Sequence, residues 1–280
     1  EPDTKLLDLP EGDRHFTRTL GIGPDGKLYV AIGSNCDVCN EKDPRYASMQ
    51  VVDIVNKKLI PYATGLRNSV FFTWNPTDGK MWATEMGRDM LGDDLPPDEI
   101  NVIAPDPSSQ SSPTRGEEES FNPSPLGRGE GEGVPDYGWP YCYGKQVHDV
   151  KFDPRDTKKE FCKTTIPAHI DLPAHSAPLG LAFIPAPLSG VNGDAQRPKE
   201  GWPEKYWYDL LVAFHGSWNR TEPTGYKIVR IKLDEQGQYE GMEDFISGWL
   251  QSDETALGRP VELLIQPNGV MYISDDKAGV

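Results

Sequence analysis

Short apolar runs rich in β-branched and aromatic residues recur along the chain, separated by polar stretches that contain Gly, Pro, Asn and Asp. One unit is repeated: a strand, a turn built on Pro with Asp-Gly or Asn-Gly, a second strand and a polar loop. It occurs at residues 18–33, 70–87 and 261–275, and more loosely at 179–216. Asp-Gly or Asn-Gly between two apolar runs is a strong hairpin signal, and no convincing helical periodicity competes with it. The pattern therefore predicts an all-β chain.

In the looser unit the second strand is expected at residues 208–214, and further strands are expected between the units at residues 49–55, 98–103 and 227–233. Short strands that recur around such turns are typical of a β-propeller, in which each blade is a small antiparallel sheet. We count about four blades in a single domain over residues 1–280.

Residues 105–134 differ from the rest of the chain, because they are rich in Ser, Pro, Gly and Glu and almost free of apolar side chains. Such a composition buries too little apolar surface to offset the entropy lost on ordering. We therefore expect a low-complexity surface insertion there.

The 280 residues carry a net charge of −16 and contain no run of basic residues, so a nucleic-acid-binding surface is not expected. A solvated surface explains the acidic excess. No apolar run approaches the ~20 residues that a membrane-spanning helix requires. Glu1 begins no signal-peptide pattern, as expected for a mature chain whose leader has been removed.

The four cysteines form a close pair, Cys36 and Cys39, and a wider pair, Cys142 and Cys162. An even number divided in this way favours two local disulfides and an oxidising compartment, and so a periplasmic or secreted protein. A zinc site is the alternative. The second pair lacks the CxxC spacing, however, and no closely spaced histidine pair accompanies it.

The hairpin at 70–87 is flanked by two polar loops. Arg67 and Asn68 precede its first strand, and Gly87 and Arg88 follow its second. In an antiparallel hairpin these two loops lie at the same end, which places a guanidinium beside an amide and flexible backbone. We expect a binding edge at this end of the hairpin.

Several loops carry Arg, His or Asn close to the ends of the repeated strands: His15, Arg67, Asn68, His175, His215 and Arg259. Loops at equivalent places in the blades of a propeller open onto one face. Converging Arg and His side chains suit a small ligand with several negative charges, because a guanidinium can bind a carboxylate through two hydrogen bonds. Histidine also suits the role of general base near neutral pH. The alternative is that each side chain only satisfies a polar group in a neighbouring blade.

Motifs over nearly the whole chain outside residues 105–134 carry a resemblance to a known family. They are HFTRTLGIGPDGKLYVAIGSNCDVCNE, GLRNSVFFTWNPTDGKMWATEMGRD, DEINVI, YGWPYCYG, LPAHSAPLGLAF, AFHGSWNR and GRPVELLIQPNGVMYISDD. With these motifs the chain resembles the soluble dehydrogenases of sugars that depend on pyrroloquinoline quinone (PQQ), especially the L-sorbosone dehydrogenase and aldose sugar dehydrogenase branch. GLRN with its hairpin, YGWP and HGSWNR are far more specific together than singly.

The resemblance implies a six-bladed β-propeller that carries PQQ and calcium on its axis. It implies an oxidoreductase that oxidises an aldose or a related sugar or aldehyde by hydride transfer to PQQ, and then passes electrons to an acceptor that the sequence does not identify. His15 resembles the general base that takes the proton of the sugar C1 hydroxyl. The preceding residue is an aspartate in the glucose dehydrogenases, whereas here it is Arg14.

Cofactor contacts are implied in the same way. Arg67 and Asn68 resemble the pair that contacts the quinone oxygens and polarises them as negative charge develops. Arg259 resembles an arginine that pairs with a PQQ carboxylate. Further contacts are expected from His175, Ser217 and Arg220.

The resemblance also implies metal ligands. Gly87 and Arg88 match positions whose backbone carbonyls bind the calcium beside PQQ, and oxygen ligands suit this hard cation. Glu99 and Tyr143 lie where some relatives hold a structural calcium.

Members of the family begin well before the position of Glu1, so roughly the first one or two blades are not represented in this chain. Two other functions are therefore weighed. One is a non-catalytic carbohydrate- or protein-binding propeller, and the other is a calcium-dependent lactonase-type hydrolase. The hydrolase would need a metal cage of Glu, Asn and Asp at the axis, whereas only Asn68 and scattered acids occupy loop positions.

Overall fold

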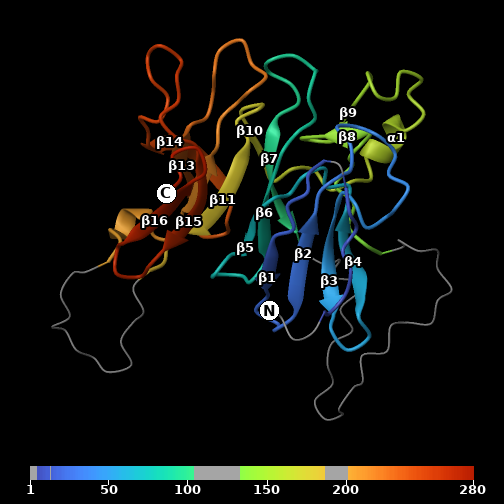
Figure 1. Ribbon diagram of the computed structural model, residues 1–280, viewed down its shortest axis with the longest axis horizontal. Helices are drawn as coiled ribbons and strands as arrows, with labels where there is room; N and C mark the ends of the chain where they lie inside the picture. Colours follow the sequence, from blue (N-terminus) through green and yellow to red (C-terminus); the bar gives the residue numbers. More distant parts are fainter. Residues whose placement is uncertain (1–4, 13, 104–132, 187–200) are drawn as a thin grey trace.

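The computed structural model (Figure 1) describes four segments of the chain, residues 5–12, 14–103, 133–186 and 201–280. In these residues the regular structure is almost entirely antiparallel β-sheet, with three four-stranded sheets and two two-stranded ones. The helical elements of the described residues are short: α1 (Lys159–Cys162) and a 3₁₀ turn at Glu204–Tyr206. The predicted all-β class is confirmed.

Each large sheet is an antiparallel meander of neighbouring strands. The first contains β1 (Leu20–Ile22), β2 (Leu28–Ile32), β3 (Ser48–Asp53) and β4 (Lys58–Thr64). The second contains β5 (Phe72–Trp74), β6 (Met81–Glu85), β7 (Asp98–Ile103) and β10 (Ile170–Leu172). The third contains β11 (Pro178–Phe183), β12 (Leu210–Phe214), β13 (Lys227–Leu233) and β14 (Tyr239–Ile246). The small sheets pair β8 (Cys142–Tyr143) with β9 (Val147–His148), and β15 (Pro260–Ile265) with β16 (Met271–Asp275).

The repeated units of the sequence form the expected hairpins. They are β1–β2, β5–β6 and β15–β16, together with the looser pair β11–β12. At the first turn Gly26 has a φ of +77° and donates its N–H to the Gly23 carbonyl at 2.9 Å. At the second, Gly79 has a φ of +70° and donates to the Asn75 carbonyl at 2.8 Å. Glycine adopts this left-handed conformation without a steric cost, which explains the Asp-Gly signal.

The strands expected between the hairpins also form, as β3, β7 and β13. Strands β4, β8, β9, β10 and β14 were not expected from the sequence. Both β4 and β14 lie at the edge of their sheets. An edge strand tolerates Pro61 in β4 and the Gly and acidic residues of β14, because one side of its backbone has no strand partner.

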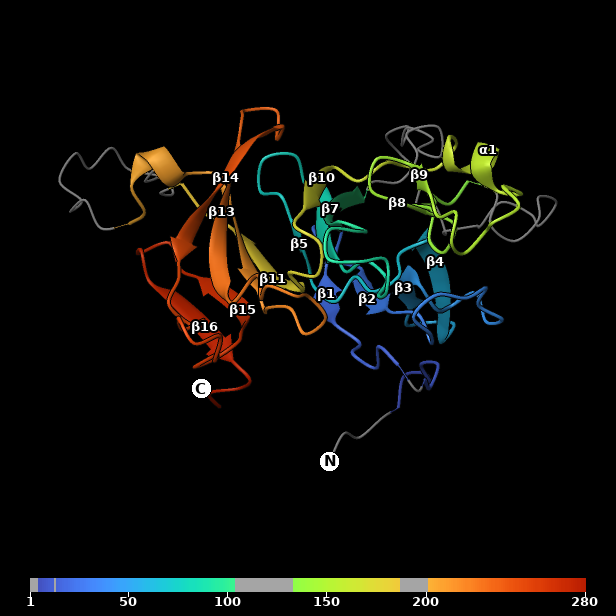
Figure 2. The ribbon, with the colours of Figure 1, turned by 90° about the horizontal axis from the view of Figure 1, so that it is seen from above.

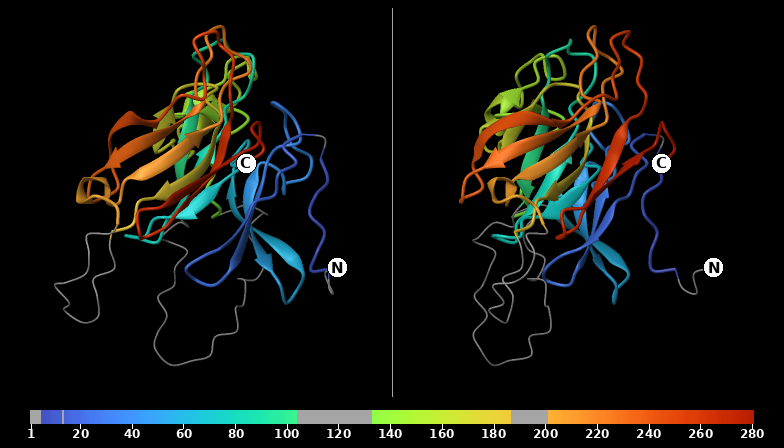
Figure 3. Two further views of the ribbon diagram at one scale, coloured as in Figure 1. Left: turned by 60° about the vertical axis from the view of Figure 1, so that its left-hand side comes forward. Right: turned by 90° about the vertical axis from the view of Figure 1, so that its left-hand side faces the viewer.

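The sheets pack against one another in chain order, with the second between the first and the third (Figures 1 and 2). One apolar cluster joins the first two sheets, through Tyr29, Met49, Met81 and Ile103. Another joins the second and third, through Trp82, Ile100, Leu181 and Val212. Neighbours on β6 thus point to opposite faces, as alternation along a strand requires. Strand β15 packs on the third sheet. Figure 3 shows the three large sheets from the side on which the third sheet lies.

Both cysteine pairs are disulfides, Cys36–Cys39 and Cys142–Cys162, which confirms the disulfide prediction and excludes the zinc alternative. The expected insertion at 105–134 lies outside the described residues apart from its last two. None of the helical segments in the described residues has the length and apolar character needed to cross a bilayer.

Candidate functional site

The loops on either side of the β5–β6 hairpin meet at one end of the second sheet, as expected. Arg67 donates from Nη1 to the Met86 carbonyl at 3.2 Å. The Asn68 N–H donates to Glu85 Oε1 at 2.6 Å, and the Ser69 hydroxyl donates to the other Glu85 oxygen. Glu85 is buried, and burial raises its pKa to about 8. Glu85 therefore ties the loop before β5 to the end of β6.

His15 is held by the segment that follows β2. Its Nδ1 lies 2.9 Å from the Ser34 carbonyl oxygen and 2.9 Å from Ser34 Oγ. Ser34 Oγ donates its own proton to the Cys36 carbonyl at 2.6 Å, so both Ser34 oxygens can accept from the ring. Nδ1 must therefore carry the ring proton, which leaves Nε2 as the basic nitrogen.

The surroundings of His15 keep its ring neutral. Burial is the largest cause, the positive charge of Arg67 is the next, and together they lower the pKa of His15 from 6.5 to about 4. Gly33 lies against both His15 and Asn68. A Cβ added to Gly33 would lie 2.6 Å from Asn68 Oδ1 and 2.6 Å from His15 Cβ. The absence of a side chain at Gly33 thus allows the base and the amide to approach each other.

Arg67 is buried and has two carboxylates beside it. Its Nη2 lies 2.7 Å from Asp37 Oδ1 and 3.6 Å from Asp89 Oδ2, and its Nε donates to the Asp37 carbonyl at 2.8 Å. Burial raises the pKa of Asp37, but the Asp89 N–H and the charge of Arg67 outweigh it and lower the pKa. Arg14, which is half exposed, reaches Asp89 Oδ2 only at 3.9 Å.

Asp89 connects this cluster to His175. Asn219 donates from Nδ2 to Asp89 Oδ1 at 2.8 Å and lies 3.2 Å from His175 Nδ1. His175 Nε2 donates to the Gly92 carbonyl at 2.8 Å, so its Nδ1 is the acceptor. Asn219 Oδ1 is buried and has no partner within the described residues. Hydrogen bonds and ion pairs thus run without a break from Arg67 to His175.

Arg259 lies at the other end of the HGSWNR loop. Its Nη1 donates to the Gly216 carbonyl at 2.8 Å, and its Nη2 donates to Tyr226 Oη at 3.0 Å and to the Ser217 carbonyl at 3.4 Å. The guanidinium also stacks on the Tyr226 ring, 4.7 Å from its centroid. His215 Nδ1 lies 3.4 Å from Arg259 Nη1, and His215 Nε2 lies 3.1 Å from Asp276 Oδ1. Most donors of Arg259 are therefore engaged by the protein, in agreement with the alternative that each cation satisfies its neighbours.

Ser217 and Arg220 also make contacts within the protein. The Ser217 hydroxyl accepts the Thr224 N–H at 2.9 Å. Arg220 donates to the Asp93 carbonyl at 2.6 Å and to the Ala174 carbonyl at 3.2 Å. These contacts fix the HGSWNR loop but do not bring either side chain to His15.

The positions expected to bind calcium follow β6 directly. The Gly87 N–H donates to Asp98 Oδ1 at 3.0 Å, and Arg88 pairs from Nη1 with Asp149 Oδ2 at 3.0 Å. Within the described residues the carbonyl oxygens of Gly87 and Arg88 accept no hydrogen bond. The Gly87 N–H and the Arg88 guanidinium are thus held by carboxylates, while the carbonyl oxygens of both residues are available as ligands.

Glu99 lies on β7, opposite Glu85 in the sheet. Its Oε1 accepts the Gly144 N–H at 2.5 Å, and its Oε2 accepts from Asn101 Nδ2 at 3.0 Å. Burial raises the pKa of Glu99 to about 7. Both carboxylate oxygens are therefore already engaged by the protein.

The sequence matches the family model described as TrAA12-like over residues 2–280. The chain belongs to the TrAA12-like family. A relative in Borreliella burgdorferi, described only as an uncharacterised protein, is 31% identical over 278 residues. That match covers 97% of this chain and 60% of the relative, so the TrAA12-like chain spans about three fifths of the length of this curated relative.

Solved structures share the fold of this TrAA12-like chain. A calcium structure of an AA12 carbohydrate-active enzyme from Trichoderma reesei aligns with a TM-score of 0.65 and 21% identity, over 96% of this chain and 68% of that one. The holo form of a pyranose dehydrogenase PQQ domain from Coprinopsis cinerea aligns with a TM-score of 0.67 and 20% identity, over 96% and 69%. The resemblance to PQQ-dependent dehydrogenases seen in the sequence is thereby confirmed.

The structure of the TrAA12-like chain brings together the expected His15, Arg67, Asn68 and His175. It adds Asn219, which sequence reasoning missed although the residue lies inside the HGSWNR motif. Asp37 was missed too, because its contact with Arg67 spans 30 residues of sequence. The only sequence signal for Asn219 and Asp37 as site residues was their position in polar loops.

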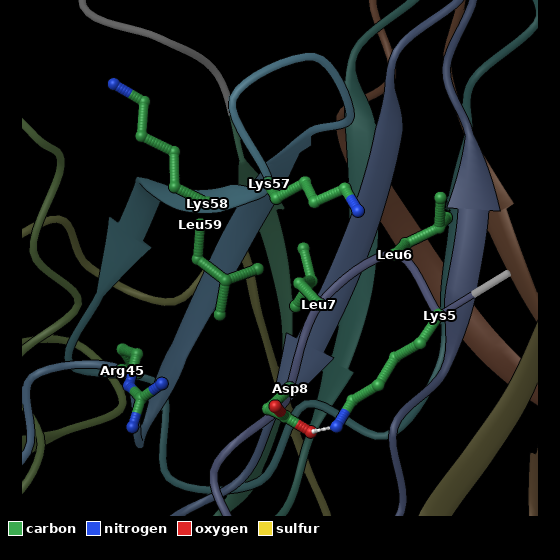
Figure 4. A pocket seen from close by; sticks show the side chains of 8 residues that line it. All are labelled: Lys5, Leu6, Leu7, Asp8, Arg45, Lys57, Lys58 and Leu59. Carbon is green, nitrogen blue, oxygen red and sulfur yellow. Dashed lines mark ion pairs between the residues drawn. The ribbon is translucent and has the colours of Figure 1, made fainter.

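A pocket of about 580 Å³ lies elsewhere, between the N-terminal segment and the turn from β3 to β4 (Figure 4). Its lining is mostly basic and apolar: Lys5, Leu6, Leu7, Asp8, Arg45, Lys57, Lys58 and Leu59. Lys5 is paired with Asp8, and Arg45 with Asp43. None of the expected site residues lines this pocket.

Proposed function

We propose that this chain carries the site of a PQQ- and calcium-dependent oxidoreductase that oxidises an aldose or a related sugar or aldehyde. One observation carries the proposal. His15 is neutral, its Nδ1 is held by Ser34, its Nε2 is left basic, and Gly33 lies against both His15 and Asn68. The TrAA12-like family and the structural neighbours, a PQQ domain and a calcium structure among them, support the cofactors and the class of reaction.

The complete propeller in this proposal has six blades. The three four-stranded sheets and the β15–β16 hairpin would represent about four of them. The coverage of 60% of the curated relative and 68% of the Trichoderma reesei structure supports a longer complete ring.

The residues around His15 fit a quinone with negative charges. Arg67 has five N–H donors. Its Nε, Nη1 and Nη2 each make a hydrogen bond within the protein, and Nη2 also pairs with Asp89 at 3.6 Å, so about one donor is left. Asn68, beside Gly33, and Asn219 Oδ1, which has no partner among the described residues, add polar atoms. Arg67 and Asn68 would hold the quinone oxygens. The rest of the cofactor contacts would come from His175, Ser217, Arg220 and Arg259. The last three of these would have to exchange contacts that they make within the protein.

His15 would act as the general base. Its Nε2 would take the proton of the sugar C1 hydroxyl, while the hydrogen bond from Nδ1 to Ser34 would hold the ring in place and stabilise the imidazolium that forms. Because its pKa is about 4, the ring is unprotonated at neutral pH and the Nε2 lone pair is present. The guanidinium of Arg67 would stabilise negative charge that develops beside it. PQQ, when bound, would supply the two-electron acceptor for the hydride.

Calcium would bind at the carbonyl oxygens of Gly87 and Arg88. Both oxygens accept no hydrogen bond in the described part of the chain, and Asp98 and Asp149 hold the flanking N–H and guanidinium. Glu99 is a second candidate, beside Tyr143. An ion there would have to replace the Gly144 N–H or the Asn101 amide at the Glu99 carboxylate.

The two disulfides support a periplasmic or secreted location. The small-molecule partner would be a sugar, and electrons would pass on to an acceptor that is not identified.

Reconstitution tests the proposal. Purified protein is titrated with PQQ and calcium, and dye reduction is followed with a panel of aldoses. We expect stoichiometric quinone binding and dye reduction with at least one sugar. Binding without reduction by any sugar in the panel would favour a binding propeller. Calcium-dependent lactone hydrolysis without quinone binding would favour the hydrolase.

A further inference from the structure

The loop from Ser34 to Glu41 lies directly after β2 and carries the CxxC motif, to which the proposed reaction gives no role. The Cys36–Cys39 disulfide closes this loop. Ser34 Oγ donates to the Cys36 carbonyl at 2.6 Å, and Glu41 accepts the Asn35 N–H at 2.6 Å. The loop is thus tied together at both ends by its own side chains.

The two sides of this loop hold two different residues of the site. Ser34, before the disulfide, accepts the Nδ1 proton of His15 at 2.9 Å. Asp37, inside the disulfide ring, accepts from Arg67 at 2.8 Å through its carbonyl and at 2.7 Å through Oδ1. Asp37 Oδ1 also accepts the Asp89 N–H at 2.9 Å. One small cross-linked loop therefore fixes the ring of the base and the guanidinium beside it.

We propose that Asp37 is a positioning residue for Arg67, and that the Cys36–Cys39 disulfide makes this positioning sensitive to reduction by dithiols. The inference rests on the proposed function for its effect on cofactor binding, but the contact from Asp37 to Arg67 is a property of the chain itself. With the disulfide closed, the Asp37 carbonyl and carboxylate face Arg67 together. With it open, the loop loses the covalent ring that holds them.

The chemistry of opening is thiol–disulfide exchange. A thiolate of the dithiol attacks one sulfur of Cys36–Cys39, and the protein S–S bond breaks as a mixed disulfide forms. The second thiol of the reductant then displaces the remaining protein thiol. Two electrons and two protons pass to the protein, which gains two thiols, and the dithiol leaves as a cyclic disulfide.

The two disulfides differ in access. Cys36 and Cys39 are half-buried, whereas Cys142 and Cys162 are 4% and 1% exposed. Because exchange requires the attacking thiolate to reach a sulfur, a dithiol reduces the first pair before the second. Mapping of alkylated cysteines by mass spectrometry verifies which pair has opened.

The first test uses the chain without cofactor. The proton exchange rate of the Arg67 Nε–H is measured by NMR in the wild type, before and after treatment with dithiothreitol under native conditions. We expect exchange to become at least about tenfold faster once Cys36–Cys39 opens, because the acceptor at the Asp37 carbonyl is no longer fixed. The C36S/C39S variant should show the fast rate with or without dithiol. An unchanged rate after verified opening would overturn the proposal.

The second test compares Asp37→Ala with Asp37→Asn. Asparagine keeps an oxygen that can accept from Arg67 and Asp89, so PQQ affinity should fall about tenfold in the alanine variant and clearly less in the asparagine variant. The matched control is Asp43→Asn, which removes a carboxylate from the same region that pairs with the exposed Arg45 instead. Equal affinity in all four proteins would refute the role of Asp37. If Asp37→Ala does not fold, the PQQ affinities of Asp37→Asn and of the reduced wild type test the role of Asp37 instead.

The two proposals fail in different ways. If the wild type binds no PQQ, the proposed function fails, and the exchange of Arg67 in the cofactor-free chain still decides the role of the loop. If the wild type binds PQQ but neither reduction nor the Asp37 variants change affinity or exchange, only the inference about the loop fails.

Discussion

The Nδ1 atom of His15 lies 2.9 Å from the carbonyl oxygen of Ser34, in a contact that spans 19 residues of sequence. This single hydrogen bond determines which ring nitrogen can act as a base. Because a main-chain carbonyl can only accept, the proton is fixed on Nδ1 and Nε2 keeps its lone pair. Burial and the nearby guanidinium of Arg67 then keep that nitrogen unprotonated.

We predict that His15 titrates in the cofactor-free protein with a pKa of about 4 instead of 6.5. The pKa of His15 in the folded state lies below its value in the unfolded state, so the contribution of His15 to the free energy of unfolding is fully present above pH 6.5. This stabilisation is lost as the pH falls from 6.5 towards 4. A two-dimensional NMR titration of the five histidines, assigned with a His15→Gln variant, measures it. A His15 midpoint near 6.5 would contradict the described environment.

Gly33→Ala should separate His15 from Asn68. The added Cβ would lie 2.6 Å from atoms of both residues, so one of them must move. We expect PQQ affinity to fall by about 10- to 100-fold, the range that an overpacked contact produces. Gly26→Ala is the control. Its Cβ would meet nothing within 4 Å, so it should lower stability through its φ of +77° and leave affinity unchanged.

Asn219→Ala should uncouple His175 from Asp89. Among the described residues the amide is the only hydrogen-bonded link between these two side chains, at 3.2 and 2.8 Å. We predict roughly tenfold lower kcat/KM with the reconstituted protein, together with an unchanged far-ultraviolet circular dichroism spectrum. Asn56→Ala serves as the matched control, because Asn56 likewise donates to a carboxylate, that of Asp53, but on the exposed surface. If both variants kept wild-type kinetics, Asn219 would have no part in the site.

Glu85→Ala should destabilise the fold by about 2–4 kcal/mol, because it leaves the Asn68 N–H and the Ser69 hydroxyl buried without their acceptor. Glu85→Gln should cost less, since its amide oxygen can still accept from Asn68. Urea unfolding at neutral pH measures the difference. Equal losses in both variants would mean that volume at Glu85, and not its hydrogen bonds, stabilises the loop.

The sequence predicted those parts of the fold whose signal is local. The hairpins follow from Asp-Gly and Asn-Gly turns, because the left-handed glycines Gly26 and Gly79 are required within a few residues of each strand. Strands β4 and β14 were not predicted, because an edge strand is stabilised by pairing with its neighbour more than by its own apolar residues.

The site divides in the same way. Arg67 and Asn68 could be placed beside the loop after β6 because hairpin geometry alone brings them there. The contacts of Asp37 with Arg67 and of Asn219 with Asp89 span 30 and 130 residues, so they depend on how the sheets are stacked. The motifs indicated which loops carry these residues, but only the assembled fold shows which residues Asp37 and Asn219 contact.

The most direct test of the central claim is the absorbance of PQQ in reconstituted wild type and His15→Gln, recorded side by side on addition of aldoses. We predict that both proteins bind the quinone stoichiometrically in the presence of calcium. A sugar should bleach the quinone spectrum in the wild type, and at least about 100-fold more slowly in His15→Gln. Folded wild type that binds no quinone, or a variant that bleaches as fast as the wild type, would contradict the account.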